Sequence, residues 1–180
     1  MPKPNRSWRE KLLDDKDLPK VSVIEGKLSK RWGHGTCVIP APREVNEVMK
    51  AVPKGRLITS KEIQAVLALK HKVTMACPLC CSIFAWIAAN AAHEAETDGA
   101  KRITPYWRTL KSGGELNPKF PGRSLTLKAR LETEGFRVIT QGKKLIVADY
   151  ESYLVSWTSE GRANTTDWAS QKVRPAKCAG

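Results

Sequence analysis

The sequence has no apolar run approaching the roughly 18 to 20 residues needed to cross a bilayer. Its opening segment, MPKPNRSWREKLLDD, lacks the apolar stretch of a secretory signal. Acidic residues are also scarce, because 31 Lys and Arg face 18 Asp and Glu, for a formal net charge of +13. We therefore expect a soluble cytoplasmic protein with a polyanionic partner. Nucleic acid is favoured over a membrane surface, since no strongly basic amphipathic helix is evident.

Paired cysteine motifs are missing as well. The chain has five cysteines, Cys37, Cys77, Cys80, Cys81 and Cys178, an odd number at uneven spacing, which favours reduced thiols. Cys77 and Cys80 have the spacing of half a zinc site, but no second Cys-x-x-Cys and no His-x-x-x-His follows, so we expect no metal and no cofactor. We expect no strand and helix of the kind that flank a redox motif. The commonest outcome for such cysteines is that they pack as small hydrophobes.

The composition is that of an ordinary globular protein, with 41% apolar and 27% charged residues. It disfavours a disordered chain, a collagen-like repeat and a disulfide miniprotein, and the length favours one folded domain. We predict an N-terminal arm over 1–40 packed on the core, a domain over 41–157, and a polar, disordered tail over 158–180. Residues 101–150 contain 11 Lys and Arg against 4 Asp and Glu. This is either a chance imbalance on a solvated surface or a surface that faces phosphates.

The pattern of apolar residues and breakers predicts a mainly α protein with small β elements. A helix is expected from Pro42 to Val52, a short strand over 56–59, and a helix over 61–71 that Thr59 and Glu62 open as a capping box. An alanine-rich helix over 82–96 follows, then a long loop over 99–122, a helix over 125–134 capped by Ser124, and a β-hairpin over 136–150. Residues 151–157 read as a final helical turn. This order suggests a winged helix-turn-helix-like domain with an added β-hairpin and extended terminal arms.

The alanines of the helix over 82–96 have two interpretations. In a helix-turn-helix, small residues on the last helix would permit close approach to a duplex. Alanine-rich helices are equally often just closely packed in a core. The sequence leaves both open.

Five segments in order resemble the DNA-binding domain of the O-6-alkylguanine-DNA alkyltransferases. They are AVPKGRLITSKEI, SIFAWIAAN, ITPYWRT, LKSGGELNPKFPG and LKARLETEG, and the resemblance covers about residues 42–138. The family has a nucleophilic Cys between Pro and His-Arg. This chain has Tyr106 at that position, within Pro105-Tyr106-Trp107-Arg108. A phenol of pKa about 10 followed by an indole cannot supply the thiolate that alkyl transfer needs. Glu134 matches the carboxylate of the family's Cys-His-Glu relay but has no imidazole to orient.

The chain is thus similar to the alkyltransferase-like proteins, the branch that lacks the Cys and binds alkylated bases without repairing them. That resemblance implies a non-enzymatic protein that recognises alkylated or modified guanine in double-stranded DNA and supports repair. The family's Tyr and Arg that extrude the damaged nucleotide align with Ser60 and Cys81, so Lys70, His71 or Lys72 would have to substitute, or no base is extruded.

The resemblance also implies two sets of site residues. An aromatic base pocket would contain Pro105, Tyr106, Trp107, Phe120, Pro121, Gly122 and the hinge residue Asn90. Core packing is the alternative for these aromatic residues. Contacts to the DNA would come from Ser60, Lys70, Lys72, Cys81, Arg108, Lys111, Lys119, Arg123 and Lys128.

Two other functions stay open. One is a winged-helix DNA-binding regulator without damage recognition, and the other is an active methylated-DNA-protein-cysteine methyltransferase in which Cys80 or Cys81 serves as a displaced nucleophile. Besides double-stranded DNA, a downstream repair protein is a candidate partner. We expect a monomer associated with the nucleoid.

Overall fold

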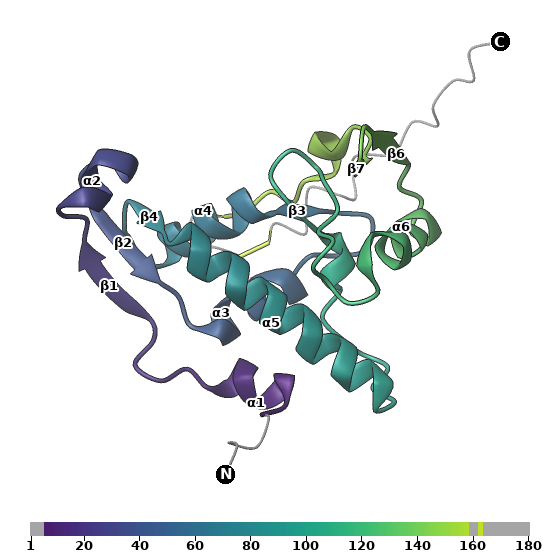
Figure 1. The fold of residues 1–180 in the computed structure, drawn as a ribbon, viewed down its shortest axis with the longest axis horizontal. Coiled ribbons are helices and arrows are strands. Elements are labelled where there is room, and N and C mark those ends of the chain that lie inside the picture. The colour runs from purple at the N-terminus through teal and green to yellow at the C-terminus, as the bar shows by residue number, and fades with distance from the viewer. Residues whose placement is uncertain (1–5, 159–161, 164–180) are drawn as a thin grey trace.

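The computed structural model describes residues 6–158, 162 and 163 (Figure 1). Along the chain lie α1 (Trp8–Leu13), β1 (Lys20–Val23), α2 (Lys27–Trp32), β2 (Thr36–Ile39), α3 (Pro42–Lys50), β3 (Ile58–Thr59), α4 (Ser60–Lys70), β4 (Met75–Ala76), α5 (Pro78–Thr97), the 3-10 turn η1 (Tyr106–Arg108), β5 (Thr109–Leu110), α6 (Arg123–Thr133), β6 (Val138–Gln141), β7 (Lys144–Val147) and the 3-10 turn η2 (Tyr150–Tyr153). The fold is mainly α with small β elements, as predicted. None of the helices in these residues is long and apolar enough to span a membrane.

The helices that were predicted around a short strand are confirmed. Pro42 begins α3, and its residues Val45, Val48 and Met49 face the core. At the start of α4 the Glu62 carboxylate accepts a hydrogen bond from the Thr59 backbone N–H at 2.8 Å, half of the expected capping box. β3 leads into α4, and β4 lies between α4 and α5.

Three small sheets hold the segments between the helices. β2 pairs antiparallel with β1 and parallel with β4, so Cys37 lies opposite Met75. β3 pairs in parallel with β5, which places Ile58 opposite Thr109. β6 and β7 form the predicted hairpin, with Val138 opposite Val147. The pairing of β3 with β5 positions the candidate site, because it brings the start of α4 beside the residues that follow η1.

Three predicted features need correction. The segment 1–40 is not simply extended, since it holds α1, β1, α2 and β2. α6 begins at Arg123 rather than after Ser124, with Gly122 as N-cap at φ +75°, where an added Cβ would lie 2.5 Å from the Thr126 side chain. The long loop over 99–122 contains η1 and β5. Most of the predicted tail, 159–161 and 164–180, lies outside the described residues.

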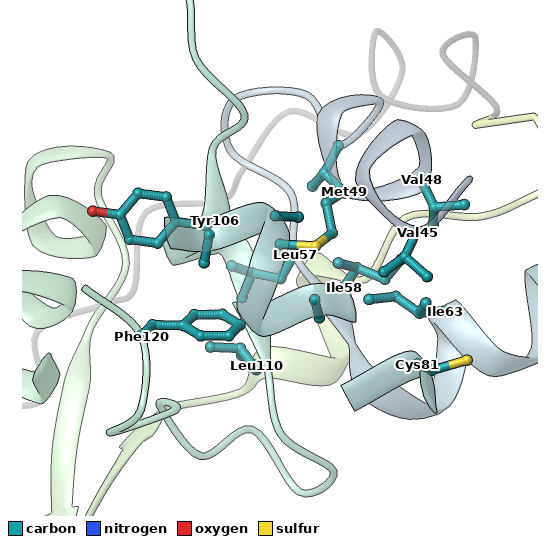
Figure 2. Close-up of a cluster of buried hydrophobic side chains, with 14 of the residues drawn as sticks. Val45, Val48, Met49, Leu57, Ile58, Ile63, Cys81, Tyr106, Leu110 and Phe120 are labelled. Atoms are coloured by element: carbon teal, nitrogen blue, oxygen red, sulfur yellow. The ribbon is translucent and has the colours of Figure 1, made fainter. Parts of the chain in front are cut away.

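The core lies where α3, α4, α5 and the segment from η1 to α6 meet (Figure 2). From α5 it receives Cys81 and a series of buried alanines, Ala85, Ala88, Ala89, Ala91 and Ala92. Because these small side chains are buried and α5 packs against α1, α3 and α4, core packing is the correct interpretation of the alanine-rich stretch. Trp8 of α1 packs edge-on against Trp86 of α5 at 4.6 Å between ring centroids.

Candidate nucleic-acid interface

Tyr106 is a core residue. Its side chain is 0% exposed and packs edge-to-face on Trp107 at 5.5 Å and on Phe120 at 6.1 Å between ring centroids. Figure 2 shows its hydroxyl directed away from the aliphatic side chains, and this hydroxyl has no hydrogen-bond partner among the described residues. Burial raises the phenol pKa further. The ring fills space in the protein, so it cannot form the wall of an open base pocket.

Glu134 organises the residues beside this ring. The indole Nε1 of Trp107 donates a hydrogen bond to Glu134 Oε1 at 2.8 Å. Arg108 donates to both carboxylate oxygens, through Nη2 at 2.8 Å and Nε at 2.9 Å, and its Nη1 donates to the Val52 carbonyl at 2.7 Å. Burial alone would raise the pKa of Glu134, but the hydrogen bonds from Arg108 and then Trp107 outweigh it, so this pKa is lowered.

These partners disfavour the predicted role of Arg108 as a phosphate contact. Only 12% of its side chain is exposed, and its guanidinium is committed to Glu134 and Val52, so it is not available to a phosphate. The aromatic residues are likewise packed, with Trp107 half-buried and Pro105 buried. The segment from Pro105 to Arg108 is a structural unit, which corrects the prediction of a pocket built on it.

Arg130 of α6 belongs to the same unit, although the sequence analysis did not single it out. Its guanidinium lies 4.6 Å from the Trp107 ring centroid and 5.6 Å from that of Tyr106, and it donates to Glu96 of α5 at 2.6 Å. Its position one helical turn before Glu134 is the signal that places it on the same side of α6.

An open pocket of about 420 Å³ lies next to this unit. Its walls come from the start of α4, the first half of α5, β5 with the residue after it, and the loop over 117–120. The lining residues are Ser60, Ile63, Leu79, Cys81, Ser82, Ile83, Ala85, Trp86, Thr109, Leu110, Lys111, Asn117, Pro118, Lys119 and Phe120. Most of this surface is apolar, and two aromatic rings, Trp86 and Phe120, take part in it.

The pocket unites residues from both predicted sets. Phe120 is the one predicted pocket residue that lines it, together with Ser60, Cys81, Lys111 and Lys119 from the predicted DNA contacts. Pro121 and Gly122 follow Phe120 but do not line it. Asn90 is one turn farther along α5, where its Nδ2 donates to the Trp86 carbonyl at 2.8 Å.

α5 presents an apolar edge beside this opening. Leu79 is 67% exposed, Ile83 43% and Trp86 36%, all from the side of α5 that lines the pocket. The Trp86 indole donates to the Lys119 carbonyl at 3.1 Å, which fixes the loop over 117–120 against α5. The helix therefore exposes large apolar side chains here, and Ala85 is the one alanine of α5 that also lines the pocket.

The cationic side chains predicted to contact DNA differ in whether they already form an ion pair within the protein. Lys70 pairs with Glu44 at 2.9 Å, Lys111 with Glu115 at 2.9 Å, and Lys128 with Glu132 at 3.7 Å. His71 also pairs with Glu44, at 2.9 Å, and its side chain is only 17% exposed. By contrast, three exposed predicted contacts form no ion pair with any described residue: Lys72, Lys119 and Arg123. Of these, Lys119 lies at the pocket itself.

In the segment CPLCC, Cys77 and Cys81 are buried and Cys80 is half-buried. Cys81, a predicted DNA contact, is 2% exposed and lines the pocket. Burial, and secondarily Cys77, raise the pKa of Cys81 to about 12. β4 does precede Cys77, and α5 opens at Pro78, so the expectation that no strand and helix flank Cys77 and Cys80 is wrong. No group of three or more His, Cys, Asp or Glu in the described part of the chain could hold a metal ion.

Comparison with known proteins adds one distant likeness. No family model and no curated protein matches the chain. Among solved structures, it is similar to the crystal structure of S. pombe Atl1 in complex with damaged DNA containing O6-carboxymethylguanine. The identity is 19%, the match covers 64% of this chain and 94% of that chain, and the TM-score is 0.42. Values this low assign no function, so the function has to be argued from the residues of this chain.

Proposed function

We propose that this protein is a non-enzymatic DNA-binding protein that holds an alkylated or otherwise modified guanine of duplex DNA and supports its repair. The pocket of about 420 Å³ beside α5 carries this proposal. Its size lies within the range of small-molecule sites, and its walls are apolar with a few polar groups, as is usual for a site that accepts a flat ring. The predicted Phe120 supplies aromatic surface together with Trp86, which takes the place of the predicted Tyr106 and Trp107.

Unpaired lysine and arginine side chains supply the attraction to the duplex. Lys119 lies in the pocket loop over 117–120 and Arg123 begins α6 three residues after that loop. Both lie in the most basic part of the chain and form no ion pair with a described residue. Displacement of counterions by such cations gives sequence-independent affinity. Lys111 contributes less in this proposal, because Glu115 already neutralises part of its charge.

Extrusion of a base needs a group that fills the vacated stack. Lys70 and His71 are both engaged with Glu44, so they are poor candidates. Leu79 is better placed, because it lies in the first turn of α5, lines the pocket and leaves most of its side chain in solvent. Apolar wedges of this kind enter between base steps in several DNA-binding proteins.

The chemistry of the cysteines supports binding rather than catalysis. Cys81 is the thiol in the pocket wall, and a thiol with a pKa of about 12 is protonated at neutral pH. Alkyl transfer needs a thiolate. The methyltransferase alternative therefore has no activated nucleophile at this site.

The regulator alternative has one observation in its favour. Ser60 is small and Cys81 is buried, and these are the positions at which the resemblance implies the base-extruding residues. A protein with the β6–β7 hairpin as a wing could then bind DNA without reading damage. Action as a monomer, recruitment of a repair protein, and a cytoplasmic, nucleoid-associated location belong to our proposal as well.

A binding titration tests the proposal. A labelled duplex with one O-6-methylguanine and the same duplex with guanine are titrated at fixed salt, and the intact protein is weighed afterwards. We expect tighter binding to the modified duplex and an unchanged mass. Equal affinities would favour the regulator, and a mass gain of one methylene would show alkyl transfer.

Lys119→Ala tests the electrostatic part. It should weaken binding to both duplexes about equally and lower the salt dependence of log K by about one unit. Lys27→Ala, at an exposed lysine of α2 away from the pocket, is the matched control and should leave both affinities unchanged.

A further inference from the structure

Trp86 has the largest side chain in the pocket wall, and two contacts restrain its indole. The residue is 36% exposed and lines the pocket. Its Nε1 donates to the Lys119 carbonyl at 3.1 Å. Its ring also packs on Trp8 of α1, with 4.6 Å between the ring centroids and 78° between the ring planes. Trp8 itself does not line the pocket, so it touches the site only through Trp86.

The helix that carries Trp8 is anchored on both sides of this residue. α1 packs against α5 (Figure 1). Arg9 donates to the Glu94 carboxylate of α5 from its backbone N–H at 3.0 Å and from its Nε at 3.3 Å. Before Trp8, Ser7 and Glu10 form a capping box, in which the Ser7 N–H donates to the Glu10 carboxylate at 2.8 Å. The backbone of Trp8 is therefore held in place on α5.

Core formation does not account for the contact between the two indoles. No residue of α1 is buried, and Trp8 is half-buried. The Lys11 ammonium lies 4.1 Å from the centroid of the Trp8 ring. A perpendicular pair of aromatic rings favours one relative orientation beyond what its buried area contributes. Because Trp86 lines the pocket, the orientation that Trp8 favours is the one that a ligand meets.

We propose that Trp8 is a positioning residue of the pocket, which holds the Trp86 indole in the orientation that contacts the bound base. This inference rests on the proposed function. It extends the site to the N-terminal segment, outside the residues 42–138 that carry the resemblance. A side chain that is ordered before binding loses less conformational entropy when the ligand arrives, so binding is tighter. Only a base that enters the pocket gains from this, so the modified duplex is favoured.

Substitutions at Trp8 test this role in the titration with the O-6-methylguanine and guanine duplexes. Trp8→Ala should weaken binding to the modified duplex about fivefold and leave binding to the unmodified duplex unchanged. Trp8→Phe keeps an aromatic ring and should recover most of the loss. Leu12→Ala is the matched control, because Leu12 is a half-buried residue of α1 that packs on the core. It should lower the Tm without changing the preference.

A double-mutant cycle shows whether Trp8 acts through Trp86. Trp86→Ala removes the wall itself, so the affinity for the modified duplex should fall by about fivefold or more. In the double variant, Trp8→Ala should cause no further loss, since the ring that it positions is gone. A role of Trp8 in stability alone would lower the affinity by the same factor with and without Trp86.

The outcomes are distinct. A Trp8→Ala protein with the full wild-type preference, or a cycle in which the two losses multiply, overturns the role of Trp8 and leaves the proposed function intact. An equal loss of preference in Leu12→Ala would also overturn that role, because any disturbance of α1 would then be sufficient. A wild-type protein without any preference overturns both the role of Trp8 and the proposed function.

Discussion

The segment Pro105–Arg108 and the pocket next to it are built from neighbouring residues but differ in how far their side chains are exposed to solvent. In the first, Tyr106 is completely buried and Arg108 is neutralised by Glu134. In the second, Leu79 and Lys119 remain largely in solvent around a hollow of about 420 Å³. Phe120 belongs to both, because it packs on Tyr106 and lines the pocket. The buried ring of Tyr106 thus belongs to a region that serves stability, and the pocket is the region with space for a ligand.

The largest expected effect is a loss of stability from a substitution in the segment Pro105–Arg108. Tyr106→Ala should lower the free energy of unfolding by about 4 kcal/mol, because it removes a fully buried ring and leaves a cavity. Urea denaturation followed by circular dichroism measures this loss. A variant that is as stable as the wild type but has lost its preference for the modified duplex would show that Tyr106 lines the pocket after all.

Glu134→Gln should have the next largest effect. It leaves the Arg108 guanidinium buried without its counter-charge, so we expect a loss of about 3 kcal/mol in the free energy of unfolding. The same denaturation experiment applies. A change below about 0.5 kcal/mol would mean that solvent reaches the pair far better than its burial indicates.

The pH dependence gives an independent view of the same carboxylate. The pKa of Glu134 is lower in the folded protein than in the unfolded chain, where it is about 4.3. Its contribution to stability is therefore present above that unfolded value, and it is lost as the pH falls through the folded pKa. We expect the Tm of the wild type to fall more steeply below pH 4.3 than that of Glu134→Gln. Parallel curves would contradict this.

A smaller effect, on DNA binding, is expected from a substitution at the pocket. Leu79→Ala should weaken binding to the modified duplex by about fivefold, since the wedge that fills the stack is lost, while stability changes by less than about 0.5 kcal/mol. Leu125→Ala is the matched control, because this leucine of α6 is 78% exposed and does not line the pocket. Equal losses in both variants would exclude a special role for Leu79.

Tyr106→Phe should have the smallest effect. The hydroxyl that it removes is buried and has no partner among the described residues, so stability should stay within about 0.5 kcal/mol of the wild type or rise. A loss above 1 kcal/mol would reveal a hydrogen bond to this hydroxyl. With Tyr106→Ala, this variant separates the packing of the ring from its polarity.

Local features of the fold were predictable because they depend on neighbours in the chain. Thr59 and Glu62 mark the start of α4, and the apolar spacing of Val45, Val48 and Met49 marks the inner face of α3. The role of Arg108 was not predictable, because its partner Glu134 lies 26 residues away and an arginine in a basic segment has the same sequence signal whether it faces solvent or a carboxylate.

The sequence by itself determined the class of the fold, the basic segment over 101–150 and the absence of a cysteine between Pro105 and Trp107. Only the tertiary structure decided which of these residues are exposed to solvent and without an ion-pair partner among the described residues. The pairing of β3 with β5 and the packing of α5 against the loop over 117–120 create the pocket. That pocket is bounded by residues from four separate segments of the chain. Burial and hydrogen bonding between distant residues are properties of the packed chain, so no local pattern encodes them.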